Sequence, residues 1–198
     1  MRVGAGCLYR WPPPAVKAFL NELPAELPAA FVLAQHIGAS FVPLLAEQLN
    51  RTSALTVKVA EQGELLREGE VVLVPVEHEV VITAEGYISL RPARESLHLP
   101  SIDHVMEMAA GRYGKQGGAI IFSGMGGDAM AGCAAMAEAG APVWVQQAES
   151  CVVSTMVDGA KLAGVVSCEA DAEQLADHIT AYLEGQGGDV ENNAIGTE

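Results

Sequence analysis

The feature that most constrains the fold of this chain is a repeated pair: a short apolar run, then a segment with helical spacing. The run at residues 29–37, AAFVLAQHI, lies between Pro28 and Gly38 and precedes the helix-like FVPLLAEQLN. The run at residues 118–122 precedes a glycine-rich loop and the helix-like MAGCAAMAE. Such runs are typical of strands buried on both faces, and their alternation with helices favours a parallel sheet. The pattern predicts an α/β fold with a doubly wound, mostly parallel sheet flanked by helices, a Rossmann-like three-layer arrangement.

The middle of the chain follows a different pattern, in which apolar and polar residues alternate. This alternation covers residues 57–92, and Gly63, Gly69 and Gly86 divide it into short pieces. A period of two residues is typical of strands that are joined by tight turns. We therefore expect a small β-hairpin portion around residues 57–92.

The length of the chain and the composition of its last residues predict its domain organisation. A chain of 198 residues is long enough to bury a substantial core in one domain. The strand and helix patterns end near residue 185, and residues 186–198, QGGDVENNAIGTE, are polar and rich in glycine. We expect one domain over residues 1–185 and a disordered tail over residues 186–198.

Charge and cysteine content exclude several functional classes. The formal net charge is −14, whereas binding to nucleic-acid phosphates requires clustered Lys and Arg. No apolar run approaches the length of a membrane span, and no signal peptide precedes the first strand. The four cysteines form neither a CxxC pair nor a zinc-ligand cluster. They are Cys7, Cys133, Cys151 and Cys168. These features predict a cytoplasmic protein with reduced thiols and with no metal, cofactor, nucleic-acid partner or membrane insertion.

Two polar residues follow predicted strands and are candidates for chemistry. His36 ends the apolar run at residues 29–37, and Asp128 follows the loop SGMGG, just before a predicted helix. Because the carboxyl ends of parallel strands share one edge of a sheet, His36 is a candidate general base and Asp128 its orienting carboxylate. Two structural readings stay open, in which Asp128 caps a helix and His36 caps its own strand. The other histidines are expected to be structural or exposed on the surface. They are His78, His98, His104 and His178.

The third member of such a triad is not evident in the first strand and its loop. The chain opens with MRVGAGCLYRW, and no serine or threonine occurs between Met1 and Ala39. A hydroxyl nucleophile at the end of the first strand is therefore missing.

Seven stretches carry a resemblance to a known family. In chain order they are VGAG, PAAFVLAQHI, LREGEVVLVPVEHEVVI, LPSIDHVMEMAA, IIFSGMGGDAMAG, AGAPVWVQQAESCVV and DGAKLAGVV. With these stretches the chain resembles, from Val3 to about Gly185, the catalytic domain of the chemotaxis protein-glutamate methylesterases, the CheB family. The resemblance implies hydrolysis of glutamyl methyl esters, and deamidation of glutamines, on the cytoplasmic helices of chemoreceptors. It also implies a Ser-His-Asp triad on a doubly wound fold, and a receiver domain that regulates the esterase in cis or in trans.

The resemblance assigns site residues one by one. The family's histidine falls on His36, its aspartate on Asp128, and the methionine that helps to form the site on Met125. The family's serine falls on Gly6, directly before Cys7, whereas an alignment from the following helix puts Tyr9 there. Nearby departures are Ser123 for a threonine and Ala129 for a glycine.

Three interpretations of the missing serine stay open. The chain is a pseudoenzyme that binds receptor helices, or it is an active esterase with a substituted nucleophile such as Cys7, or Gly6 is a substitution introduced into an active enzyme. The longer first loop and the clustered departures favour the pseudoenzyme. The sequence therefore predicts a methylesterase-like domain with weak or lost hydrolysis, and a chemoreceptor or similar helical signalling protein as its partner.

Overall fold

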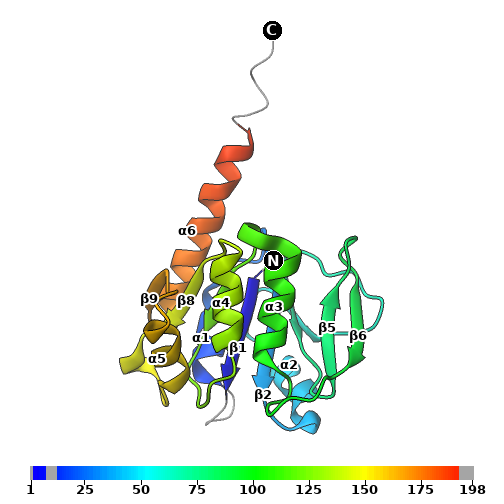
Figure 1. Cartoon of the computed structure of the whole chain (residues 1–198). Coiled ribbons are helices and arrows are strands. Elements are labelled where there is room, and N and C mark those ends of the chain that lie inside the picture. Colours follow the sequence, from blue (N-terminus) through cyan, green and yellow to red (C-terminus); the bar gives the residue numbers. More distant parts are fainter. Residues whose placement is uncertain (1, 8–12, 192–198) are drawn as a thin grey trace.

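Seven strands form one sheet in which every neighbouring pair is parallel, in the order β3-β4-β2-β1-β7-β8-β9 (Figure 1). The structure is a computed structural model. It describes the backbone of residues 2–7 and 13–191 and the side chains of residues 13–185. The strands of this sheet are β1 (Arg2–Cys7), β2 (Phe31–His36), β3 (Thr56–Val59), β4 (Glu70–Leu73), β7 (Ala119–Ile121), β8 (Val143–Gln146) and β9 (Cys168–Ala170). The predicted doubly wound parallel sheet is confirmed.

Helices cover both faces of this sheet and produce the three layers. The helices are α1 (Pro14–Glu22), α2 (Val42–Asn50), α3 (Ile102–Tyr113), α4 (Met130–Glu138), α5 (Thr155–Leu162) and α6 (Ala172–Glu191). Helices α3, α4 and α5 pack on one face, and α1, α2 and α6 on the other (Figure 1). Because strand residues alternate between the two faces, Val32 of β2 joins the first core and Leu33 the second. Short 3-10 turns are η1 (Ala39–Phe41), η2 (Gly114–Gln116) and η3 (Ala148–Ser150).

The order of the strands predicts a binding region at one edge of the sheet. After β1 the chain builds the sheet outward through β2 and β4, and it then returns to place β7 on the other side of β1. Ligands of open parallel sheets bind beyond the carboxyl ends of the strands at such a reversal. The ends of β1, β2 and β7 therefore define the region where a site is expected.

The predicted hairpin portion around residues 57–92 is only partly correct. A two-stranded antiparallel hairpin is present, formed by β5 (His78–Ile82) and β6 (Ile88–Pro92). Strands β3 and β4, however, belong to the parallel sheet, and all four residues of β4 are buried. Alternation within a strand does not reveal its partner, which explains the error. Strand β9 was not predicted, because its three residues, CEA, carry no apolar run.

The C-terminal boundary also differs from the expectation. Helix α6 continues to Glu191, beyond residue 185, where the predicted tail begins. Glycines at positions 185, 187 and 188 weaken helix propensity, which is why the sequence indicated an earlier end. Residues 192–198 lie outside the described part. Over the helices that the structure describes, none is both long and apolar enough to cross a membrane.

Close packing of α3 against α4 brings two helix N-termini together near the site. A β-carbon built on Gly132 would lie 2.6 Å from Cβ of Met106, far inside contact distance. Glycine at this position therefore allows the two helix axes to approach each other. This approach fixes the spacing between the first turns of α3 and α4.

Candidate functional site

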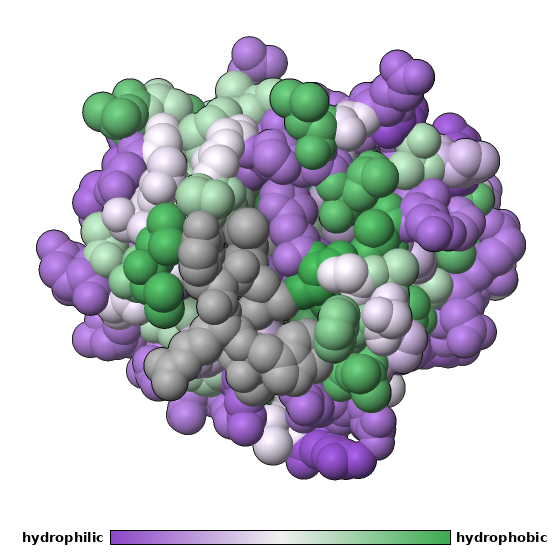
Figure 2. All heavy atoms as spheres, turned by 90° about the horizontal axis from the view of Figure 1, so that it is seen from below, coloured by the Kyte–Doolittle hydropathy of each residue, from purple (hydrophilic) through white to green (hydrophobic). Residues whose placement is uncertain are grey.

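Three strand ends meet at the carboxyl edge of the sheet, as expected. His36 is the last residue of β2, and the backbone register pairs it with Cys7, the last residue of β1. Asp128 lies in the loop that follows β7. Figure 2 shows the molecule from this edge, which lies at the bottom of Figure 1.

The structure brings the predicted histidine and aspartate together, across 92 residues of sequence. Nε2 of His36 lies 2.7 Å from Oδ2 of Asp128, and the two side chains are 14% and 4% exposed. With an ionised carboxylate, Nε2 carries the hydrogen and donates it. Nδ1 is then the basic nitrogen of the ring. This arrangement is the orienting half of a nucleophile–histidine–carboxylate triad, with the two ring nitrogens exchanged relative to the chymotrypsin arrangement.

Asp128 also binds the first turn of α3. Its Oδ2 accepts a hydrogen bond from the backbone N–H of Ile102 at 2.8 Å, and its Oδ1 accepts one from that of Asp103 at 3.0 Å. Burial alone would raise the pKa of Asp128. The hydrogen bonds from His36 and from these two amides outweigh burial, and they lower the pKa. Asp128 is therefore an anion that is held ready to orient His36.

The structural reading of Asp128 as the cap of its own helix is wrong. The N-cap position of α4 is Ala129, and no side chain caps it there. The carboxylate instead binds α3, whose N-cap residue is Ser101. Ser101 accepts a hydrogen bond from the backbone N–H of His104 at 3.3 Å. The carboxylate crosses to the neighbouring helix because α3 and α4 pack so closely.

Asp103 makes the reciprocal connection from α3 to α4. Its Oδ1 accepts hydrogen bonds from the backbone N–H groups of Ala129 at 3.0 Å and of Gly132 at 2.7 Å. Burial and the nearby charge of Asp128 raise the pKa of Asp103, although the two amides oppose this shift. Each helix therefore receives its N-terminal carboxylate from the other one, which fixes the backbone on both sides of Asp128. No pattern in the sequence indicates this role of Asp103.

The serine hydroxyls near this pair are engaged elsewhere. Oγ of Ser101 lies 3.4 Å from Oδ1 of Asp128, so it contacts the carboxylate and not the base. Oγ of Ser123 accepts hydrogen bonds from the backbone N–H groups of Val152 and Val153, both at 3.1 Å. Neither serine is placed to act as the nucleophile of His36.

The end of β1 holds the predicted nucleophile position. Gly6 pairs with Gln35 in the backbone register, and Cys7 pairs with His36. The side chain of Cys7 and the whole of Tyr9 lie outside the described residues. Burial raises the pKa of Cys133 to about 12 and that of Cys151 to about 11, which makes both of them poor nucleophiles.

Large apolar side chains are exposed in segments that adjoin the strand ends in sequence. Met125, the methionine that the resemblance assigned to the site, is 53% exposed in the loop after β7. Other large apolar side chains follow the ends of β2 and β8 or precede α3. They are Phe41, Leu44, Val152 and Leu99. Figure 2 shows hydrophobic groups on this face of the molecule. We call these five side chains the apolar rim.

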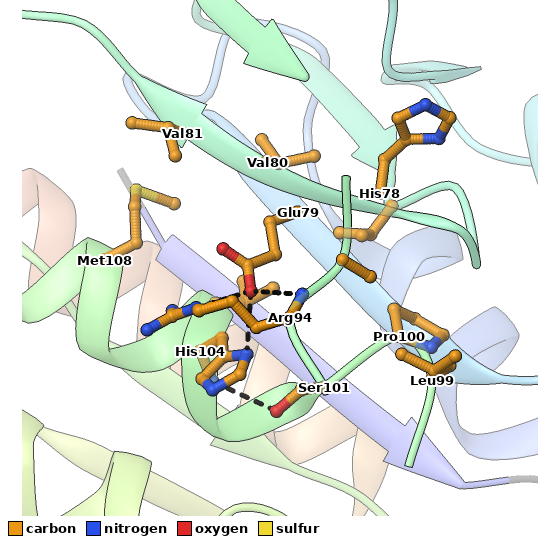
Figure 3. Close-up of a pocket in the computed structure, with 13 residues that line it drawn as sticks. His78, Glu79, Val80, Val81, Arg94, Leu99, Pro100, Ser101, His104 and Met108 are labelled. Atoms are coloured by element: carbon orange, nitrogen blue, oxygen red, sulfur yellow. Dashed lines mark hydrogen bonds and ion pairs between the residues drawn. The ribbon is translucent and has the colours of Figure 1, made fainter. Parts of the chain in front are cut away.

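Residues that line a pocket between the β5–β6 hairpin and α3 also hold the N-terminus of α3 in place (Figure 3). Oε1 of Glu79 in β5 accepts hydrogen bonds from Nε of Arg94 at 2.6 Å, and it lies 3.1 Å from Nδ1 of His104 in α3. Burial alone would raise the pKa of Glu79, but the bonds from Arg94 outweigh it and lower the pKa. This cluster ties the hairpin to the first turn of α3.

One further residue of the site was missed. The ring of His98 stacks on that of His36, with centroids 5.2 Å apart and planes at 17°. His98 is predicted from the sequence to be structural or exposed, because nothing about a lone histidine in a loop indicates a place beside His36. Within the part of the chain that the structure describes, no group of three or more His, Cys, Asp or Glu side chains is arranged to hold a metal ion.

Comparison with known proteins agrees with this geometry. The family model of the CheB methylesterases matches residues 12–179. The chain belongs to this family. It is 35% identical over 172 residues to protein-glutamate methylesterase/protein-glutamine glutaminase 2 of Pseudomonas savastanoi pv. phaseolicola, covering 86% of this chain and 43% of that protein. It is 34% identical to the enzyme of the group 1 operon of Pseudomonas putida, with 86% and 45% covered.

A solved structure gives the same fold. The catalytic domain of the CheB methylesterase of Thermotoga maritima superposes with a TM-score of 0.86 at 28% identity, covering 91% of this chain and 97% of that one. The predicted membership of the CheB family is therefore confirmed. The chain spans less than half the length of the two Pseudomonas enzymes.

Proposed function

We propose that this CheB-type domain binds methylated helices of a chemoreceptor or a similar signalling protein in the cytoplasm, and that its own ester hydrolysis is weak or lost. The observation that carries the proposal is the difference, at the carboxyl edge of the sheet, between the His36–Asp128 pair and the end of β1. His36 and Asp128 form a 2.7 Å pair, whereas the strand end beside them carries Gly6. A base without a nucleophile leaves only the residual rate that comes from binding and electrostatics.

The apolar rim supports a protein partner. Its side chains are 42% to 58% exposed, and they come from segments that follow β2, β7 and β8 or precede α3. Exposed apolar groups that gather at one site are typical of protein-binding surfaces, and an amphipathic helix is a common occupant. As a receptor-binding domain without efficient hydrolysis, the protein would protect methylated helices or compete with an active esterase. A receiver domain, in the same chain or in another one, is a further proposed partner.

Methanol release from methylated receptor tests the loss of hydrolysis. We expect little release by the wild type, and release by Gly6→Ser that is at least about 100-fold higher, because the serine would complete the triad. Deamidation of receptor glutamines is measured on the same samples. Robust release by the wild type would overturn the pseudoenzyme proposal.

Binding is tested separately, with receptor helices in the methylated and the unmethylated form. We expect the wild type to bind, and Met125→Asp together with Phe41→Asp to weaken binding at least about tenfold, because both substitutions put charge into the apolar rim. Leu162→Asp, at an exposed apolar residue of α5 outside the rim, is the matched control. Absence of binding by the wild type would overturn the receptor-binding role.

A second candidate function is hydrolysis through Cys7. The observation that favours it is the backbone register, which pairs Cys7 directly with His36. A thiol beside a histidine forms a thiolate readily and is a competent acyl-transfer nucleophile. Under this alternative, Cys7→Ala would abolish methanol release by the wild type, whereas Cys168→Ala, at a half-buried cysteine on β9, would not change it. Release that survives Cys7→Ala would exclude the thiol.

A further inference from the structure

A second histidine completes the surroundings of the His36 ring. His98 belongs to the segment that joins β6 to α3, and its ring stacks on that of His36 with centroids 5.2 Å apart and planes at 17°. In this arrangement one face of each imidazole ring lies against one face of the other. The ring of His36 is thereby held from two sides, by the carboxylate of Asp128 at Nε2 and by the face of His98.

The chain places His98 firmly at this position. Its backbone N–H donates a hydrogen bond to Oγ of Ser96 at 3.3 Å, and three residues later Ser101 caps α3. A β-carbon on Gly126 would lie 3.8 Å from Cε1 of His98 and 3.9 Å from its Nε2, so the ring is also a close neighbour of the loop that carries Asp128. His98 therefore lies near both members of the acid–base pair.

We propose that His98 is a positioning residue for His36, which holds the imidazole in its bond to Asp128 and couples the protonation of the two rings. This role rests on the acid–base pair of the proposed function, but it requires no nucleophile. A neutral aromatic face within about 6 Å stabilises a neighbouring cation, so neutral His98 favours the imidazolium form of His36. A protonated His98 opposes that form, because two like charges then lie side by side.

Charged groups around the ring pair come from two other elements. Asp128 lies in the loop before α4 and bonds to His36 directly. Asp103, in the first turn of α3, donates its backbone N–H to Asp128 and binds the amide of Ala129 with its carboxylate. The carboxylate of Asp128 favours a positive charge on the ring of His36, which it contacts directly.

Side-chain NMR of the intact chain tests the coupling directly. The imidazole shifts of both rings are followed against pH in the wild type, His98→Phe and His36→Phe. Phenylalanine keeps a flat ring and removes the second charge. We expect the titration curve of each ring to change when its partner is replaced by phenylalanine. His178→Phe, at an exposed histidine on α6, is the matched control and leaves both curves unchanged.

The positioning role has its own readout in the ring tautomer. In the wild type and in His98→Phe, the ring nitrogen shifts of His36 at neutral pH should report hydrogen on Nε2. In His98→Ala they should move toward an average of both tautomers, and His98→Gln gives the same comparison if the alanine variant does not fold. Identical His36 titration and tautomer in the wild type and in all His98 variants would overturn the proposal. Because these measurements use no substrate, they remain decisive even if receptor binding or hydrolysis fails its own test.

Discussion

The carboxyl edge of the sheet has two unlike regions. Where the loop after β7 meets the first turn of α3, every carboxylate oxygen of Asp128 has a hydrogen-bond partner, and Asp103 returns two bonds to α4. At the end of β1, the resemblance to the family predicts a nucleophile at position 6, where this chain has Gly6, with Cys7 beside it. One region is complete and the other lacks the expected hydroxyl.

The difference between these two regions shows that one residue, Asp128, both orients His36 and caps the first turn of α3. Asp128 orients His36, but two of its bonds go to backbone amides of α3, so the fold requires it whether or not the protein hydrolyses esters. A serine at position 6 would make no comparable contribution to the stability of the fold. Loss of chemistry can therefore remove the nucleophile while it leaves the carboxylate in place. The presence of Asp128 alone is weak support for catalysis, and its structural share can be measured.

The largest effect is expected for Asp128→Ala. The substitution leaves the amides of Ile102 and Asp103 without their acceptor in a buried place and removes the partner of His36. We expect the free energy of unfolding to fall by about 3 kcal/mol, measured by urea denaturation at pH 7. Asp177→Ala, at an exposed position of α6, is the control and should change it by less than about 0.5 kcal/mol. A loss for Asp128→Ala as small as that of the control would show that the carboxylate has a catalytic role only.

A smaller loss is expected for Asp103→Ala. Its carboxylate caps α4 through Ala129 and Gly132, but burial and the charge of Asp128 already disfavour its ionised form. We expect the free energy of unfolding to fall by about 2 kcal/mol, and Asp103→Asn, which keeps an oxygen acceptor, to recover about half of that loss. Glu107→Ala, at an exposed position on the same helix, is the control. If Asn were no better than Ala, the charge would matter more than the cap.

The two carboxylates should also respond to pH with opposite signs. The folded pKa of Asp128 is lowered, so its stabilising contribution is present above the unfolded pKa and is lost as pH falls through the folded value. The folded pKa of Asp103 is raised, so its contribution favours the folded state at low pH and is lost as pH rises through the folded value. Urea denaturation at pH 6 and pH 3 should show a smaller acid loss for Asp128→Asn than for the wild type, and a larger one for Asp103→Asn. Equal acid losses in all three proteins would contradict this assignment.

Much of the fold was predictable because it depends on local patterns, whereas the site depends on packing. The apolar runs indicated β2 and β7, and the helical spacing that follows them indicated α2 and α4. His36 and Asp128 were found because both follow such runs. The reciprocal bond from Asp103 and the stacking of His98 depend on how closely α3 approaches α4 and the loop after β7, which no local pattern reports. The sequence predicted β3 and β4 as part of a hairpin portion, whereas they belong to the parallel sheet. This error has the same cause, because the partner of a strand depends on residues far away in the sequence.

The smallest effect concerns Ala129, where the resemblance to the family predicts a glycine. Ala129 has φ of 130°, a conformation that side chains other than glycine adopt only with strain, and it is fully buried. Its amide bond to Asp103 holds it there. Ala129→Gly relieves strain of about 1–3 kcal/mol, but it removes a buried methyl group and adds freedom to the unfolded chain, at a combined cost of about 1–2 kcal/mol. We therefore expect a net change in the free energy of unfolding of less than about 1 kcal/mol.

Ala34→Gly is the matched comparison for this last prediction, because Ala34 is equally buried in the same core but has ordinary strand geometry. That variant loses the methyl group without relief of strain and should be destabilised by about 1–2 kcal/mol. Parallel urea denaturation of the two variants isolates the strain stored beside Asp128. Equal losses would mean that the turn after Asp128 is unstrained, and that the bonds of Asp103 serve α4 without holding the backbone in place for His36.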